Sequence, residues 1–293
     1  MRIERRAEAA LVFNTLIWGS TFVVVKQALR DVSPVLFLAL RFSLATVALL
    51  VLFRKSWSRP HKPRWSLAGG VIAGVFLFSG YAFQTIGLQF TTAPKSAFLT
   101  GLTSAMVPLL SAIVYRKSPH IMEISGVLVA TCGMGLMTLT GPTLAINRGD
   151  LLTVCCAACY AAHILVLSHY SKGSFELLAV TQIGVSALLA WSLFRWIETP
   201  SIRWTPGVWS AILITGLLAT ALAFSLQAWA QQHTTSTRTA LIFTLEPVFA
   251  WITSYLLTGE TLSPRAAGGA GLILAGVLAV EMKPVPRPEH RFQ

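Results

Sequence analysis

Long apolar stretches separated by short polar segments run through the whole chain. Ten can be read, each near the roughly 20 residues that cross about 30 Å of hydrocarbon. They lack the alternation of barrel strands, so the pattern predicts membrane-spanning helices, which satisfy their own backbone groups. The stretches are Ala9–Val25, Val35–Phe53, Leu67–Leu88, Ala97–Tyr115, Ile121–Leu139, Leu151–Ser168, Leu177–Ile197, Val208–Ala230, Thr239–Leu257 and Ala266–Val280.

One segment occurs twice. Residues 81–97 align without gaps on residues 224–240, with glutamines, threonine pairs and a basic residue coinciding 143 positions apart. A period this long indicates two large homologous halves. Five spans per half is an odd number, so the second half starts on the opposite side of the membrane. The sequence therefore predicts an all-α integral membrane protein with ten transmembrane helices in two inverted five-helix repeats.

The repeats divide the chain into three parts. We expect the first five-helix repeat in residues 1–140, the second in 146–282 and a disordered cytoplasmic tail in 283–293. A turn at Gly141-Pro142 would join the halves. Repeats in membrane proteins usually bracket a transport site at their interface.

Composition and charge agree with this assignment. The chain of 293 residues is 54% hydrophobic and 12% charged, which is typical of an integral membrane protein. With the N-terminus in the cytoplasm, 15 Lys and Arg residues lie on that side, 7 on the other, and Arg41 within a span. This bias predicts that both termini are cytoplasmic, and we expect the protein in the inner membrane. The net charge of +12 is then explained mostly by the basic residues that orient the protein in the membrane, and no nucleic-acid partner is expected.

Two ionisable residues lie deep within predicted spans. Arg41 is seven residues into the second span and Glu246 eight residues beyond Arg238, about 10 and 12 Å from the nearer membrane surface. Such residues are costly in lipid and suggest function. A structural ion pair is one interpretation. In the other, Arg41 attracts a substrate carboxylate while Glu246 handles a cation or a coupling proton.

Other polar residues could serve the same site. His163 lies within the sixth span, and histidine changes charge near neutral pH; a simple hydrogen bond to a neighbour is the alternative. Gln84 and Gln227 each follow an aromatic residue by three positions, which places ring and amide on one helical face. That combination suits a small-molecule pocket or interhelical hydrogen bonding.

Prolines and small residues suggest how the helices move and pack. Pro108 and Pro247 interrupt corresponding spans about one turn out of register, so each could form a hinge or a static kink. The fifth and tenth spans carry matching small residues: Gly126 aligns with Gly271, and Ala130, four residues later, aligns with Ala275. We expect these spans to pack together or to form a homodimer interface.

Several kinds of chemistry lack their motifs. Cys156 and Cys159 have a CxxC spacing but lie in an apolar span without a second ligand pair, so we expect no metal site. Neither a GxxxxGK[ST] phosphate loop nor a GxSxG or HExxH motif is present. We therefore expect no enzyme activity and no cofactor.

The order of these features resembles the EamA-type permeases of the drug/metabolite transporter superfamily, over nearly the whole chain. Tyr160 stands where the family usually has tryptophan. The resemblance implies alternating access around a central cavity and a substrate among amino acids, other small metabolites and toxic compounds. The matching motifs are Trp18-Gly19-Ser20-Thr21-Phe22, Pro34, Arg41-Phe42, Phe98 to Leu102, Val107-Pro108, Gly149-Asp150, Glu246-Pro247 and Gly259-Glu260.

The resulting hypothesis is a permease that exports small polar, amino-acid-like metabolites, driven by their gradient or by protons. We expect coupling by Glu246 and His163. The alternatives are a membrane-embedded enzyme acting on lipid-linked substrates and a non-transporting scaffold. The residues expected to line the cavity or bind the ligand are Trp18, Arg41, Tyr81, Gln84, Tyr160, Phe224, Gln227 and Trp229.

Overall fold

The computed structural model of the chain describes residues 2–55, 62–91, 93–116, 120–139, 147–258 and 263–281. The expected turn at Gly141-Pro142, the tail at residues 283–293 and the Gly259-Glu260 motif lie outside these residues. All regular elements within the described residues are helices. They are α1 (Arg2–Ala28), α2 (Pro34–Leu52), α3 (Pro63–Gly87), α4 (Ala93–Gly101), α5 (Thr103–Tyr115), α6 (Ile121–Thr138), α7 (Arg148–His169), α8 (Phe175–Ile197), α9 (Pro206–Gly216), the π-helix η2 (Leu217–Leu222), α10 (Ala223–Ala230), α11 (Ser236–Phe243), α12 (Glu246–Thr258) and α13 (Pro264–Glu281).

Local sequence explains where many helices begin. Helices α2, α3, α9 and α13 start with proline. Proline has no backbone N–H, and it suits this position because an N–H in the first turn has no partner within the helix. The side chains of Ser174, Thr205 and Thr235 accept hydrogen bonds from backbone N–H groups in the first turns of α8, α9 and α11. Asn147 and Asp150 form a reciprocal capping box at the start of α7.

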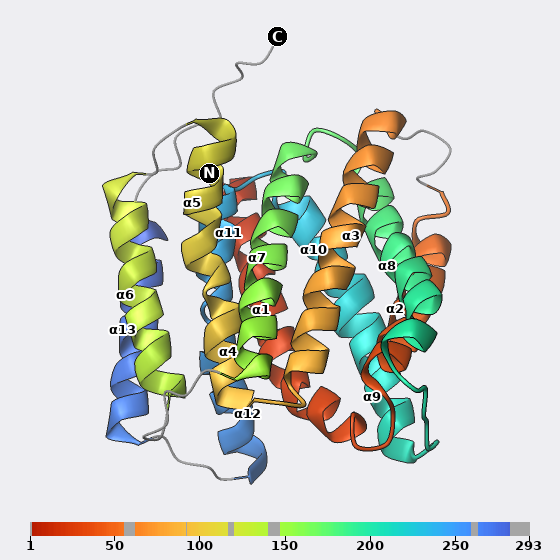
Figure 1. Ribbon diagram of the computed structural model, residues 1–293. Coiled ribbons are helices and arrows are strands. Elements are labelled where there is room, and N and C mark those ends of the chain that lie inside the picture. Colours follow the sequence, from red (N-terminus) through yellow and green to blue (C-terminus); the bar gives the residue numbers. More distant parts are fainter. Residues whose placement is uncertain are drawn as a thin grey trace.

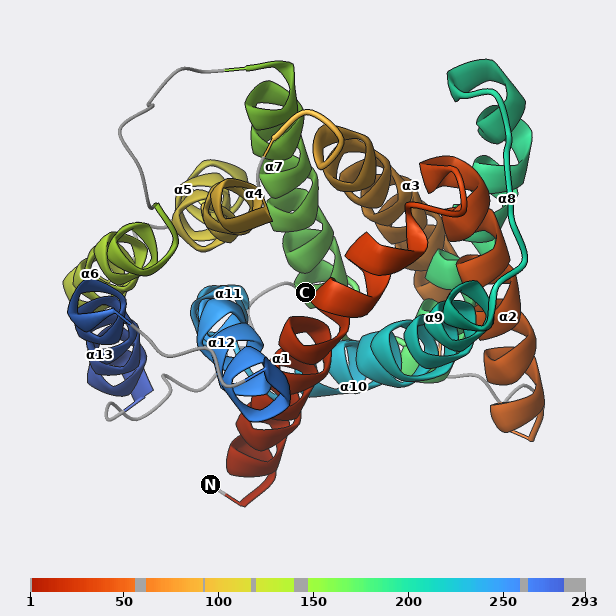
Figure 2. The same cartoon turned by 90° about the horizontal axis from the view of Figure 1, so that it is seen from below.

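The helices pack as one bundle with α1 near its middle (Figures 1 and 2). Helix α3 of the first half packs against α7 and α8 of the second half. Helix α1 of the first half packs against α9 and α10 of the second half. Helix α2 lies between α8 and α9. Contacts between the halves therefore build the centre of the bundle.

Three of the expected spans are interrupted. The fourth is divided into α4 and α5 at Leu102, the eighth contains η2 between α9 and α10, and the ninth is divided at Thr244-Leu245. Hydroxyl groups contribute to two of these breaks: Thr103 donates to the carbonyl of Thr100, and Thr244 to that of Leu241. Such local bonds compete with the regular helix ladder.

Helix boundaries in the two halves match at the spacing of the sequence repeat. Helices α3 and α10 end at Gly87 and Ala230, and α4 and α11 begin at Ala93 and Ser236, each pair 143 residues apart. The breaks at Leu102 and Leu245 have the same separation. The local duplication thus has a structural counterpart, while the inverted arrangement of two five-helix repeats stays a prediction.

The two prolines differ in position. Pro108 lies inside α5, whereas Pro247 is the second residue of α12, immediately after the break. A proline in a first turn removes no helix hydrogen bond. The hinge role of both residues stays a prediction.

Helices α6 and α13 lie side by side at one edge of the bundle (Figure 2). Their glycines face one another: a Cβ added at Gly133 would lie 2.5 Å from the Gly269 carbonyl oxygen, and one added at Gly126 would lie 2.9 Å from that of Gly276. The expected packing of the fifth and tenth spans is thus seen within one chain. It uses Gly269 and Gly276 of α13 and not Gly271, where an added Cβ would meet nothing within 4 Å. A homodimer through these helices stays a prediction.

Seven helices in the described residues are long and apolar enough to cross a membrane. They comprise α1, α2, α3, residues 98–115, α7, α8 and residues 206–230; α6 and α13 are shorter apolar helices. The N-terminus of α1 and the C-terminal end of α13 lie at the same end of the bundle (Figure 1). An all-helical multi-span membrane protein is confirmed, at a coarser level than the ten predicted spans.

Candidate functional site

Arg41 lies buried in the bundle, with 3% of its surface exposed. Its Nε donates to Thr220 Oγ1 at 2.6 Å, and Nη2 donates to the Tyr81 hydroxyl at 3.0 Å and the Ala219 carbonyl at 3.2 Å. The guanidinium also lies 4.7 Å from the centre of the Tyr81 ring, a cation–π contact. Its Nη1 donates no hydrogen bond to any residue in the described part of the chain.

The π-helix η2 supplies two of the three acceptors for Arg41. The Ala219 carbonyl oxygen accepts from Arg41 and also from Trp18 Nε1, at 2.9 Å. Thr220 donates its hydroxyl to the Thr215 carbonyl, five residues earlier, at 2.8 Å. A π-turn is a local departure from α-helical bonding that is frequent at functional sites. Here it presents one side chain and one carbonyl to the buried cation.

A group of aromatic rings adjoins this cation through Tyr81. The ring of Tyr81 lies 5.6 Å from that of Tyr160 and 6.2 Å from that of Phe224, both edge to face. The ring of Trp18 lies 5.4 Å from that of Phe224. We call Trp18, Arg41, Tyr81, Tyr160 and Phe224 the central cluster. Five of the eight residues predicted to line the site therefore come together, from α1, α2, α3, α7 and α10.

Gln84 adjoins the central cluster. Its Oε1 accepts from the Tyr160 hydroxyl at 3.5 Å, and its Nε2 donates to Thr100 Oγ1 at 3.1 Å. The amide therefore connects α3 with α4 and α7. It is the polar group next to the aromatic rings that the sequence pattern predicted on this helical face.

Gln227 and Trp229 make different contacts. Gln227 donates to Gln231, which in turn donates to the Ile164 carbonyl, while Gln227 Oε1 is buried without a partner among the described residues. Trp229 lies against His233, with ring centres 5.2 Å apart. Neither residue has a ring contact or hydrogen bond to the central cluster.

His163 forms a buried polar pair beside the aromatic rings. Its Nε2 lies 2.7 Å from Gln182 Oε1, and its ring packs edge to face on Phe224 at 5.8 Å. Gln182 Nε2 is buried and unpartnered among the described residues. The hydrogen-bonding neighbour of His163 is thus Gln182. His163 also contacts the central cluster through the ring of Phe224.

Glu246 opens α12 and is partly buried. Its carboxylate has no hydrogen bond or ion pair within the described residues, and Arg41 has the other partners given above. The two groups therefore do not pair in this conformation. The backbone of Glu246 packs on Gly19 of α1, where an added Cβ would lie 2.7 Å from the Glu246 carbonyl oxygen.

Two important residues were missed by sequence reasoning. Thr220 carried no signal, because a threonine in an apolar helix ordinarily bonds its own backbone. Arg238, which the charge count placed at the membrane surface, is 5% exposed and pairs with Glu8 at 2.9 Å. Its signal was the acidic residue Glu8, directly before an apolar span, since buried charges need partners.

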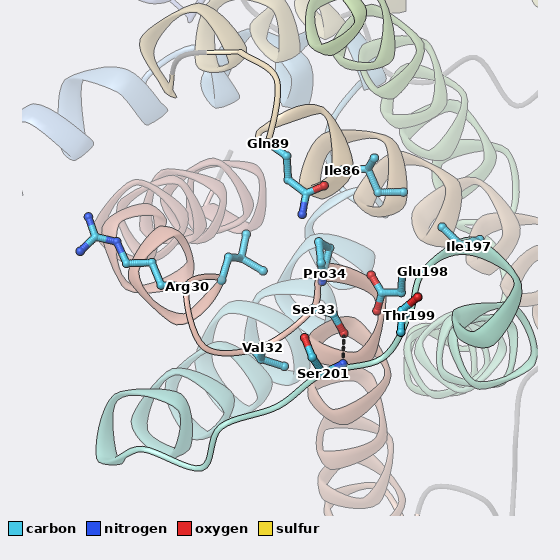
Figure 3. Close-up of a pocket in the computed structure, with 11 residues that line it drawn as sticks. Arg30, Val32, Ser33, Pro34, Ile86, Gln89, Ile197, Glu198, Thr199 and Ser201 are labelled. Atoms are coloured by element: carbon cyan, nitrogen blue, oxygen red, sulfur yellow. Dashed lines mark hydrogen bonds between the residues drawn. The ribbon is translucent and has the colours of Figure 1, made fainter.

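A cavity of about 300 Å³ lies at the end of the bundle where α1 turns into α2 (Figure 3). Glu198 lies beside it and accepts hydrogen bonds from the backbone N–H groups of Val35 and Leu36, at 3.0 and 2.8 Å. Gln89 points toward the cavity, whereas the Arg30 guanidinium points away from the other labelled residues (Figure 3). None of these residues was predicted from the sequence to belong to a site, although Gln89 is one of the glutamines matched in the repeat.

Comparison with known proteins gives a consistent family. The model of the EamA-like transporter family matches residues 5–139 and again residues 147–282. An uncharacterized transporter of Archaeoglobus fulgidus is 35% identical, over 94% of this chain and 86% of its own length. The uncharacterized transporter YoaV of Bacillus subtilis is 26% identical, over 91% and 94%. A WAT1-related chloroplastic protein of Arabidopsis thaliana is 25% identical, over 92% and 68%.

The fold recurs in a solved structure. A crystal structure of a protein that is 17% identical superposes with a TM-score of 0.78, over 94% of this chain and 96% of the other. That likeness concerns the fold alone. The family matches, which cover both parts of the sequence, establish that the chain belongs to the EamA-like transporter family of the drug/metabolite transporter superfamily.

Proposed function

We propose that this transporter exports a small, polar, amino-acid-like metabolite by alternating access. The observation that carries the proposal is the arrangement of Arg41. Its Nε and Nη2 are held by Thr220, Tyr81 and Ala219, while Nη1 has no partner within the described residues. A buried cation with free donors and aromatic neighbours attracts a carboxylate.

The neighbouring residues suit the rest of such a ligand. Trp18, Tyr81, Tyr160 and Phe224 offer ring faces for apolar side-chain atoms or an ammonium group. Gln84 offers an amide beside Tyr160. Gln227 and Trp229 remain our candidates for the part of the path along α10, where Gln227 Oε1 is unpartnered among the described residues.

Coupling is assigned to Glu246, with His163 as a second candidate. The Glu246 carboxylate lacks a hydrogen-bond partner within the described residues and lies at the break between α11 and α12. A carboxylate in this position can take up and release a proton as α12 moves. Pro108 and Pro247 would serve as the hinges of the interrupted spans.

The topology follows from the charge bias. Both termini would face the cytoplasm of a cell whose inner membrane holds the protein, and the two five-helix repeats would be inverted. The lipid bilayer and the substrate are the proposed partners, with protons as the coupling ion. No catalytic chemistry is needed for this function.

The test is counterflow in proteoliposomes that contain the purified chain. Labelled amino acids and related metabolites would be presented with and without an imposed pH gradient. Saturable uptake by the wild type and its loss in Arg41→Gln would support the proposed site. Normal uptake by both Arg41→Gln and Glu246→Gln at every pH would contradict both assignments.

The rival functions make different predictions. A scaffold needs no water-filled path, so cysteines placed at positions 84 and 227 would be protected from polar thiol reagents. A transporter cavity would make at least position 84 reactive, and substrate would slow the reaction. An enzyme acting on lipid-linked substrates would convert such a substrate chemically, which mass spectrometry of the recovered lipid would detect.

A further inference from the structure

Two loops from different halves of the chain join at one end of the bundle. One connects α1 to α2 and the other connects α8 to α9. Val32 and Ile202 form an isolated antiparallel bridge, with hydrogen bonds from Ser33 N to the Ser201 carbonyl at 2.9 Å and from Arg203 N to the Asp31 carbonyl at 2.7 Å. We call residues 31–33 and 201–203 the clamp.

Side chains reinforce the clamp. Arg203 Nε donates to Asp31 Oδ1 at 3.1 Å, and Ser201 N donates to the Ser33 hydroxyl at 3.2 Å (Figure 3). Nearby, the Glu198 carboxylate accepts from Val35 N and Leu36 N in the first turn of α2. The α8–α9 loop therefore holds both the α1–α2 loop and the start of α2.

The clamp joins the same elements that meet at Arg41. Helix α2 carries Arg41, and η2, which continues α9, carries its partners Ala219 and Thr220. Arg41 is seven residues after Pro34, which places it about 10 Å along α2 from the clamp. A path from this end to Arg41 that passes between α2 and α9 requires the two loops to separate.

We propose that the clamp is the gate at this end of the transport path, and that the chain is seen here with this gate closed. The proposal rests on the alternating access proposed above. The cavity beside Glu198, Ser33 and Ser201 is then the vestibule outside the closed gate. By the charge bias, this end faces away from the cytoplasm.

The clamp is built to open. The Arg203 side chain is 80% exposed and that of Asp31 23% exposed. Ion pairs this exposed contribute little net stability and are screened by salt. A bridge with two backbone hydrogen bonds is also far shorter than a stable sheet. The clamp can therefore close this end without trapping the protein there.

The bridge geometry gives a direct test. Val32 and Ile202 are a non-hydrogen-bonded antiparallel pair, because the hydrogen bonds join their neighbours. The Cα atoms of such pairs lie about 4.5 Å apart, within the range that a disulfide accepts. The double variant Val32→Cys with Ile202→Cys would be made in a chain whose Cys132, Cys155, Cys156 and Cys159 are replaced by alanine and which still transports.

Oxidation should form the disulfide and lower counterflow at least tenfold, and reduction should restore it. Each single-cysteine variant, oxidised in the same way, is the control and should transport normally. Failure of the disulfide to form would overturn the geometry. Full transport by the cross-linked chain would overturn the gate.

A second readout does not depend on the substrate. With Gln84→Cys added, the cross-linked chain should react with an impermeant thiol reagent from the side opposite the clamp and not from the clamp side. Asp31→Arg should increase labelling from the clamp side several-fold, and adding Arg203→Asp should reverse the increase. If wild-type chain moves no amino acid but this labelling pattern holds, the substrate class is wrong and the gate stands. Equal labelling from both sides after cross-linking would overturn the gate alone.

Discussion

Arg41 and Thr220 are 179 residues apart in sequence and 2.6 Å apart in space, from Nε to Oγ1. The threonine hydroxyl accepts this bond while donating its own proton to the Thr215 carbonyl. Its donor and acceptor functions are thus both used. Because the bonds fix the plane of the guanidinium, they also fix where Nη1 points, the nitrogen that has no partner within the described residues.

Replacing Thr220 by valine removes the hydroxyl with almost no change in shape. A hydrogen bond to a charged group contributes about 1.5–3 kcal/mol, so we expect the apparent affinity for a carboxylate substrate to fall about 10- to 100-fold. Substrate titration of counterflow measures this, and Thr220→Ser should restore most of it. Thr239→Val, which removes a buried hydroxyl that bonds only its own helix, should leave the affinity unchanged.

Lysine cannot replace Arg41. A single ammonium cannot donate to Thr220, Tyr81 and a substrate carboxylate in the planar fork that arginine provides. We expect Arg41→Lys to lower counterflow at least tenfold while the protein remains folded in detergent. Arg265→Lys on the exposed start of α13 is the matched control. Equal rates for both variants would refute a binding role for the Arg41 fork.

Gly19 permits the contact between α1 and α12. An alanine Cβ there would lie 2.7 Å from the Glu246 carbonyl oxygen and 2.8 Å from Ala250 N, both backbone atoms. Overpacking of this kind costs about 1–3 kcal/mol, so Gly19→Ala should lower the unfolding temperature. Gly268→Ala, where an added Cβ meets nothing within 4 Å, should leave it unchanged or raise it. Thermal unfolding in detergent compares the two.

Glu246→Gln separates coupling from binding. The glutamine cannot carry the proton, but it keeps the size and polarity of the side chain. We expect counterflow without a pH gradient to survive and gradient-driven accumulation to be lost. Glu123→Gln, at the exposed start of α6, should retain both activities. Accumulation by Glu246→Gln at the wild-type level would assign coupling to another group.

The sequence predicted the helical membrane architecture because apolar length is a direct consequence of bilayer thickness. It also placed aromatic residues and Arg41 in one expected cavity, since buried charge and aromatic rings inside spans are rare enough to indicate a common site. The rings of Trp18, Tyr81, Tyr160 and Phe224 lie together beside Arg41, whereas Gln227 and Trp229 lie apart from them. Their role in binding stays a prediction.

What the sequence left unpredicted depends on contacts between distant segments. Nothing local distinguishes Thr220 from other threonines in apolar helices, and the π-turn around it is bonded to Arg41 and Trp18 from distant helices. The clamp likewise joins residues about 170 positions apart in two short polar loops. Gln227 shares the local sequence pattern of Gln84, yet it faces Gln231 instead of the cluster, because matching patterns do not ensure matching neighbours.

The close fit of α6 and α13 has a consequence for biosynthesis. The glycine face of α6 leaves the ribosome long before its partner, because α13 begins at Pro264 and α6 ends at Thr138. At common translation rates of about 5–20 residues per second, α6 waits roughly 6 to 25 s for the helix that completes it. During that interval lipid or a chaperone must cover the glycine face of α6. In a nascent chain released before α13 is made, this face would remain without its partner helix.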